Sequence, residues 1–166
     1  MYFTTFFDKN YLSRGLVLIE SLQSHTSFFT IYVLCLDEFT LNFFKQNKEQ
    51  YPEVKTILLS DIEKSDPELY SIKNERRLIE YYFTLSPCLP LYLLKKYNLP
   101  HICSLDADIQ FYSSPQPLFD YLNEYSIIIT PHKFSKEVSD LLKWGVNNVS
   151  FQIFKNDIVG IKCLEL

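Results

Sequence analysis

Hydrophobic positions in the first sixty residues alternate between short apolar runs and a segment with a helical period. Between residues 11 and 24, apolar side chains recur every three or four positions, which is typical of an amphipathic helix. The short runs are rich in aromatic and β-branched residues, which favours buried strands. The pattern predicts a strand over 2–7, a helix over 11–24, a strand over 28–36, a helix over 41–50 with Thr40 as its N-cap, and a strand over 54–59.

The rest of the chain continues the alternation less regularly. Residues 61–74 are polar, and a long helical segment over 75–97 contains Pro87 and Pro90, which we expect to kink it or split it in two. Further on, the pattern predicts strands over 101–105, 125–130 and 146–154, with short helices opening at 114–117 and spanning 136–143. Strands that alternate with helices predict an α/β fold, with a mostly parallel sheet flanked by helices on both faces.

Composition is that of one globular domain over residues 1–166, with 47% hydrophobic and 22% charged residues. Only three glycines are present, and neither G-x-G-x-x-G nor G-x-x-x-x-G-K-[ST] occurs, which argues against Rossmann dehydrogenases and P-loop enzymes. The net charge of −4 and the absence of a basic patch argue against nucleic-acid binding.

The cysteines and the first seven residues give information about the cellular location of the protein. The four cysteines are far apart, lie in apolar runs and form no C-x-x-C pair, so we expect reduced core thiols in a cytoplasmic protein, although the spacing leaves disulfides open. Residues 1–7 have no basic region or cleavage site and resemble a strand more than a signal peptide. The sequence contains no run of about 20 apolar residues, so it predicts no transmembrane segment.

The pair Asp106 and Asp108 carries the main chemical signal. Residues two apart in extended backbone point the same way, and this pair follows the predicted strand 101–105. Two carboxylates at the carboxyl end of a strand form a hard-oxygen site that suits Mg²⁺ or Mn²⁺ together with substrate phosphates. The alternative is a turn in which one aspartate caps the following backbone.

Three ordered segments resemble nucleotide-sugar glycosyltransferases with a GT-A fold, nearest to the family 8 type of glycogenin and the lipopolysaccharide galactosyltransferases. They are residues 4–22, residues 103–119 with the Asp-Ala-Asp motif, and residues 145–151. A Glu-Tyr-Tyr-x-Thr-x-x-Pro stretch at 80–87 is shared with uncharacterised bacterial proteins of this kind. The resemblance covers nearly all 166 residues. It implies the donor-nucleotide-binding part of one GT-A domain, because the family continues for roughly another hundred residues.

The resemblance implies a UDP-sugar donor, with Asp106 and Asp108 holding Mn²⁺ or Mg²⁺. Ala107, between them, is small and leaves room for the ligand. The base and ribose of the donor would lie at the end of the first strand. There the family's binding positions fall on Thr4, Thr5, Asp8 and Tyr11, of which Tyr11 would stack on uracil. The alternative for Tyr11 is a core or helix-entry residue.

Three further positions follow from the resemblance. Arg76 matches a basic donor-binding position, with Arg77 as the competing candidate, and Glu80 is expected to orient Arg76 through an i,i+4 pair. The structural alternative is a solvated cation at the helix start. Asn148 matches a sugar-contacting Asn, although Ser150 stands where the family usually has Gly, which adds a side chain near the sugar.

Three functions compete at this point. The first is a hexosyltransferase-like glycosyltransferase that acts on a saccharide acceptor, with His132 as a candidate acceptor contact. By analogy with the family, it would act in lipopolysaccharide biosynthesis and could contact a membrane peripherally. The second is a truncated, non-catalytic nucleotide-sugar-binding module. The third is an Asp-x-Asp phosphohydrolase, which is disfavoured because its nucleophilic aspartate would follow the first strand.

Overall fold

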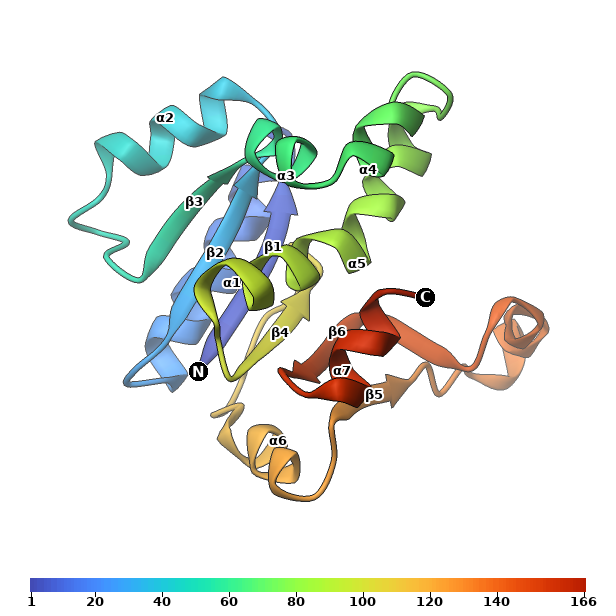
Figure 1. Ribbon diagram of the computed structural model, residues 1–166. Coiled ribbons are helices and arrows are strands. Elements are labelled where there is room, and N and C mark those ends of the chain that lie inside the picture. The colour runs from blue at the N-terminus through green and yellow to red at the C-terminus, as the bar shows by residue number, and fades with distance from the viewer.

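A six-stranded sheet with the order β3-β2-β1-β4-β6-β5 forms the centre of the computed structural model, which describes all 166 residues (Figure 1). The first half of the chain supplies β1 (Tyr2–Phe7), α1 (Leu12–His25), β2 (Thr30–Cys35), α2 (Glu38–Gln46) and β3 (Val54–Leu58). The strands β3, β2, β1 and β4 are parallel neighbours. This confirms the predicted α/β order of elements, and the boundaries of four of the five elements lie within about two residues of the expectation.

The N-cap of α2 is corrected by the structure. The carboxylate of Asp37 accepts a hydrogen bond from the backbone N–H of Thr40 at 2.8 Å, so Asp37 is the N-cap and Thr40 lies inside the helix. The helix also ends at Gln46, four residues before the predicted end. An aspartate that follows a strand is a stronger N-cap signal than the threonine three positions later.

The polar stretch after β3 contains two short helices that the sequence pattern missed, α3 (Leu59–Ser65) and α4 (Pro67–Ile72). The Asp66 carboxylate caps α4 by accepting from the backbone N–H of Leu69 at 2.9 Å. The long helix α5 (Leu78–Tyr97) is not split at its two prolines. Burial of its face with Leu85, Leu89 and Leu93 stabilises the helix against the loss of proline hydrogen bonds.

The second half of the chain completes the sheet. It forms β4 (His101–Leu105), α6 (Gln116–Asp120), η1 (Tyr121–Asn123), β5 (Ile127–Pro131), η2 (Lys136–Trp144), β6 (Asn147–Lys155) and α7 (Ile158–Leu164). The strand β6 lies between β4 and β5 and is antiparallel to both. The helix α7 was not predicted. Its start is fixed by Asp157, whose carboxylate accepts from the backbone N–H groups of Val159 and Gly160.

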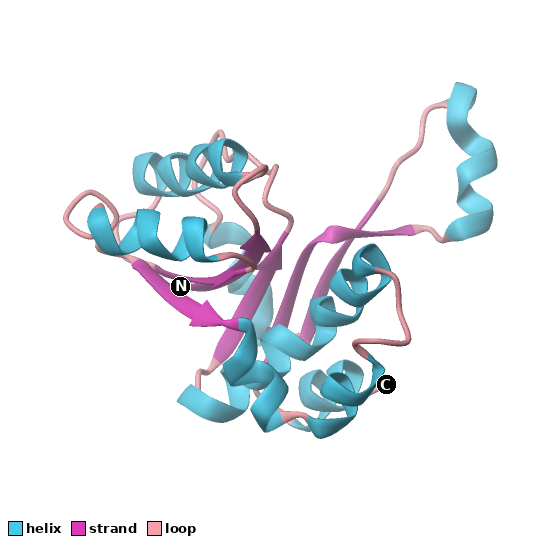
Figure 2. Cartoon of the chain, turned by 90° about the horizontal axis from the view of Figure 1, so that it is seen from above, coloured by secondary structure: helices cyan, strands magenta, loops and turns pink.

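Two hydrophobic cores cover the two faces of the sheet, with helices on both sides (Figure 2). Alternate residues of β2 belong to different cores, as the period of a strand requires: Val33 joins α1 in one core, whereas Leu34 joins α5 in the other. All four cysteines are free. Cys35 and Cys103 are buried as expected, but Cys163 is exposed on α7. No helix is long and apolar enough to span a membrane.

Residues 132–146, which we call the arm, project away from the sheet between β5 and β6 (Figures 1 and 2). None of the residues in η2 is buried. The arm contains several exposed apolar side chains, among them Leu142 and Trp144. The predicted short helix over 136–143 is present as this 3₁₀ segment. It contributes nothing to either core.

Candidate functional site

A pocket of about 710 Å³ opens at the carboxyl ends of β1 and β4. The two strands are parallel neighbours, so the residues that follow them, Asp8 and Asp106, arrive at the same edge of the sheet. Asp8, Tyr11, Asp106, Ala107 and Asp108 all line this pocket. The structure therefore brings together five of the nine donor-site residues predicted from the sequence, at the edge where open α/β sheets bind their ligands.

A backbone hydrogen bond to β6 fixes the Asp106-Ala107-Asp108 loop. Ala107 is buried, whereas both aspartates are solvent-accessible. The backbone N–H of Asp106 donates to the carbonyl of Ser150 on β6 at 2.9 Å, which ties the loop to the neighbouring strand. Partial burial of the Asp106 carboxyl, and then the negative charge of Asp108, raise its pKa. A divalent cation would relieve this repulsion between like charges.

The donor set around the aspartate pair is limited to the two carboxylates. No group of three or more His, Cys, Asp and Glu side chains is placed to hold a metal ion anywhere in the chain. Two carboxylates that share a pocket nevertheless fit Mg²⁺ or Mn²⁺, because these ions combine one or two carboxylates with water and substrate phosphate. Asp106 and Asp108 are the residues that would hold such an ion.

The turn between β1 and α1 fixes Asp8 and Tyr11. One oxygen of the Asp8 carboxylate accepts from the backbone N–H groups of Asn10 at 2.9 Å and Tyr11 at 3.3 Å, and the other accepts from the Asn10 side chain at 3.0 Å. Tyr11 is 45% exposed, and the guanidinium of Arg14 lies 4.6 Å from the centre of its ring. A cation on a tyrosine ring is a favourable contact that orients the ring.

The beginning of α5 forms a wall of the pocket that the sequence reasoning did not identify. Leu78, Tyr82 and Ser86 line it at a spacing of four, together with Ile79 and Phe83. This spacing places them on one helix face, and three of them lie inside the Glu-Tyr-Tyr-x-Thr-x-x-Pro stretch, so the signal was present in the sequence. Burial, followed by the charges of Asp8 and Asp37, raises the pKa of Tyr82.

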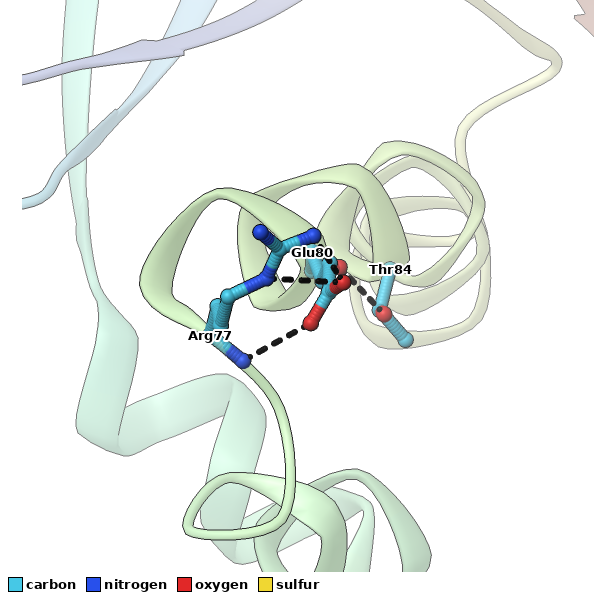
Figure 3. Close-up of polar contacts among 3 residues, drawn as sticks. All are labelled: Arg77, Glu80 and Thr84. Carbon is cyan, nitrogen blue, oxygen red and sulfur yellow. Dashed lines mark hydrogen bonds and ion pairs between the residues drawn. The ribbon is translucent and has the colours of Figure 1, made fainter.

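Two neighbouring arginines at the start of α5 have different surroundings. Arg77 lines the pocket and pairs with Glu80 (Figure 3). Arg76 donates to the Thr84 hydroxyl and is not part of the lining. The expected pair between Glu80 and Arg76 is replaced by an i,i+3 pair with Arg77. The hydrogen bonds from the Arg77 side chain and backbone lower the pKa of Glu80, and the charge of Arg76 acts in the same direction.

The remaining predicted residues lie outside the lining. Thr4 and Thr5 are buried in β1: the Thr4 hydroxyl donates to the carbonyl of Tyr32 at 3.1 Å, and the Thr5 hydroxyl has no partner. The Asn148 side chain accepts from the backbone N–H of Ser150 at 2.9 Å, while its neighbour Val149 lines the pocket. Outside these predicted donor positions, His132 stacks on Phe134 in the arm.

Sequence comparison finds relatives but no described family. A scan of known protein families gives no match. Two proteins of Bacillus subtilis (strain 168) are similar to this chain. YfnF is 28% identical over 172 residues, and the match covers 98% of this chain and 55% of YfnF. YfnD is 27% identical over 135 residues, and the match covers 81% of this chain and 42% of YfnD. Both are described as uncharacterized. The chain spans about half the length of these curated relatives.

Solved structures give the fold. Mouse xyloside xylosyltransferase 1 superposes with a TM-score of 0.68 at 12% identity, covering 99% of this chain and 69% of the mouse chain. The galactosyltransferase LgtC, bound to donor and acceptor sugar analogues, gives 0.64 at 16% identity, with 100% and 60% covered. GlyE of Streptococcus pneumoniae TIGR4 gives 0.62 at 15% identity, with 98% and 36% covered. The chain has a GT-A fold. The expectation from the sequence is thereby confirmed at the level of fold, and sugar transfer is the general activity of these neighbours.

Proposed function

We propose that this chain binds a UDP-sugar and belongs to a glycosyltransferase that moves the sugar to a saccharide acceptor, with Mn²⁺ or Mg²⁺ at Asp106 and Asp108. The observation that carries the proposal is the pocket at the ends of β1 and β4, which combines this aspartate pair with the exposed ring of Tyr11. A nucleoside diphosphate offers a base for the ring and charged oxygens for a cation. The fold of the solved neighbours supports the same assignment.

Each residue has a defined task in this proposal. Asp106 and Asp108 hold the divalent ion, which supplies Lewis-acid stabilisation to a leaving nucleoside diphosphate when it is bound. Tyr11 stacks on the uracil, an interaction of about 1–3 kcal/mol in single-strand nucleic-acid complexes. Asp8 holds the turn that carries Tyr11 and presents a carboxylate to the pocket. The small side chain of Ala107 leaves room between the aspartates.

The acceptor side is proposed from the neighbours. The saccharide acceptor follows from a neighbour whose structure contains donor and acceptor sugar analogues. A role in lipopolysaccharide biosynthesis and contact with a membrane surface extend the same analogy.

A second candidate is a non-catalytic module that binds nucleotide sugars without transferring them. The observation that favours it is the donor set, because two carboxylates without a third protein ligand leave most positions of a bound ion to water. Both candidates predict UDP binding, and only the first predicts turnover of a UDP-sugar.

Isothermal titration of UDP, with and without Mn²⁺, tests the proposal. We expect Mn²⁺ to strengthen UDP binding to the wild type, and Asp108→Ala to remove most of this gain, about tenfold or more, because one of the two charged ligands is lost. Asp140→Asn, an exposed aspartate of the arm, is the matched control and should behave as wild type. The proposal is wrong if UDP does not bind, or if UDP binds equally well with and without Mn²⁺. Release of free sugar from a UDP-sugar distinguishes the two candidates, because an enzyme would release it and a binding module would not.

A further inference from the structure

Arg77 is the one basic side chain among the sixteen residues that line the pocket. Three carboxylates accompany it, those of Asp8, Asp106 and Asp108. A divalent ion would offset two of these three negative charges, and Arg77 is the positive side chain of the lining that can meet the phosphate oxygens of a diphosphate.

The guanidinium of Arg77 is held on one edge and left available on the other. Its Nε and Nη2 both donate to one oxygen of the Glu80 carboxylate, at 3.0 and 2.6 Å, and the backbone N–H of Arg77 donates to the other oxygen at 2.9 Å. The remaining nitrogen, Nη1, has no protein partner and points away from Glu80 (Figure 3). Glu80 thus fixes the group in place without using all of its donors.

We infer that Arg77 binds the diphosphate of the nucleotide donor and that Glu80 is the positioning residue that holds the guanidinium for it. The inference rests on the proposed function, since it assigns a residue to the same pocket. A planar guanidinium makes charge-assisted hydrogen bonds to phosphate oxygens, and preorganisation by a carboxylate reduces the side-chain freedom that binding must remove.

Arg76 provides the contrast within the same sequence. It has the same charge and lies one residue earlier, but its guanidinium donates to the Thr84 hydroxyl and does not line the pocket. A general effect of positive charge near α5 would involve both arginines alike. A specific contact with the ligand involves Arg77 alone.

Titrations of UDP and of uridine at saturating Mn²⁺ test the inference, because uridine has the base and ribose but no phosphate. We expect Arg77→Gln to weaken UDP roughly ten- to hundredfold while changing uridine less than about twofold. Arg76→Gln, the matched control, should leave both ligands within about twofold of wild type. Circular dichroism and thermal unfolding show whether each variant is folded.

Glu80→Gln is expected to weaken UDP several-fold, and the double variant Arg77→Gln/Glu80→Gln should bind UDP no more weakly than Arg77→Gln alone. This non-additivity is the signature of a residue that acts through another. If wild type binds UDP and Arg77→Gln binds it equally well, or loses uridine to the same extent, the inference is wrong and the proposed function stands. If wild type binds no UDP, both fail. Additive losses in the double variant would exclude the positioning role of Glu80.

Discussion

The centre of the sheet and its β5 edge differ in how deeply their residues are buried. The central strands β1 and β2 lie between helices, and all of their residues are buried or half-buried. At the edge, no residue of β5 and none of the first four residues of β6 is buried, and the arm between these strands contains Trp144 at 80% exposure. The same sheet therefore has a core region whose side chains are enclosed and an outer region that packs against the cores through Ile127 and Ile128 of β5.

The candidate site lies on the border between these regions. The strand β4 pairs with β1 on one side and with β6 on the other, and the aspartate loop follows it. Asp8 and Tyr11 come from the buried region, whereas Val149, 64% exposed, comes from the outer one. The candidate pocket therefore has one wall next to buried strands and one wall that is exposed to solvent.

The largest expected effect comes from the buried region. Phe3 on β1 is fully buried and contacts Phe29, Phe111 and Phe119 edge-on, with ring centres 5.4–6.2 Å apart. We expect Phe3→Ala to cost about 3–5 kcal/mol of unfolding free energy, since it leaves a cavity among aromatic rings. Urea denaturation followed by circular dichroism measures it.

Trp144→Ala in the arm is the matched control, with an expected change within about 0.5 kcal/mol. Comparable losses for the two variants would contradict the division into a core region and an outer region.

An intermediate effect is expected at the junction of β6 and α7. A Cβ atom added to Gly160 would lie 2.1 Å from the backbone carbonyl oxygen of Lys155, so Gly160→Ala forces the helix away from the strand. We expect a loss of about 1–3 kcal/mol, although alanine favours a helix elsewhere. Val159→Ala, on the exposed side of the same helix, should stay within about 0.5 kcal/mol in the same denaturation experiment. A Gly160→Ala protein that is more stable than wild type would show that β6 and α7 can move apart without a loss of stability.

The smallest effect depends on pH. His101 begins β4 between the rings of Tyr2 and Phe119, and burial, followed by the positive N-terminus, lowers its pKa to about 4. The unfolded chain takes up the proton near pH 6.5, so the folded protein is most stable above that pH and loses stability as the pH falls toward 4. We expect this loss to be about 1–2 kcal/mol, because the side chain is only partly enclosed.

The comparison of wild type with His101→Phe by urea denaturation from pH 7.5 to 4.5 isolates this contribution. The stability of wild type relative to the variant should decrease on acidification. A constant difference between the two proteins would show that His101 does not titrate in this range.

The fold could be predicted from the sequence wherever burial imposes a period. Strands with both faces in a core, such as β1 and β2, are short runs rich in aromatic and β-branched residues, and α1 shows a helical repeat. The helices α3, α4 and α7 are seven, six and seven residues long, too short for a clear repeat. The N-caps Asp66 of α4 and Asp157 of α7 were available signals, whereas α3 has no side-chain cap. The intact α5 could not be predicted from Pro87 and Pro90, because tertiary burial decides whether such a helix survives.

The position of site residues was predictable where they follow a strand and not where they lie at the start of a helix. Asp8 and Asp106 are placed by the parallel pairing of β1 with β4, which the α/β pattern implies. Which of Arg76 and Arg77 lines the pocket depends on the direction of two neighbouring side chains at a helix start, and in the structure Arg77 lines it and pairs with Glu80. Whether Arg76, Thr4, Thr5 or Asn148 contacts a donor stays a prediction.

The pairing of β1 with β4 has a consequence for the order of folding. Phe3 lies opposite Cys103, a hundred residues later, whereas β1 and β2 meet across a single helix. Contacts between distant parts of a chain are entropically costly to form and slow folding. We therefore expect β1, β2 and β3 to associate early and the aspartate loop to reach Asp8 only near the end. Until β4 joins the sheet, the pocket lacks the wall that contains Asp106 and Asp108.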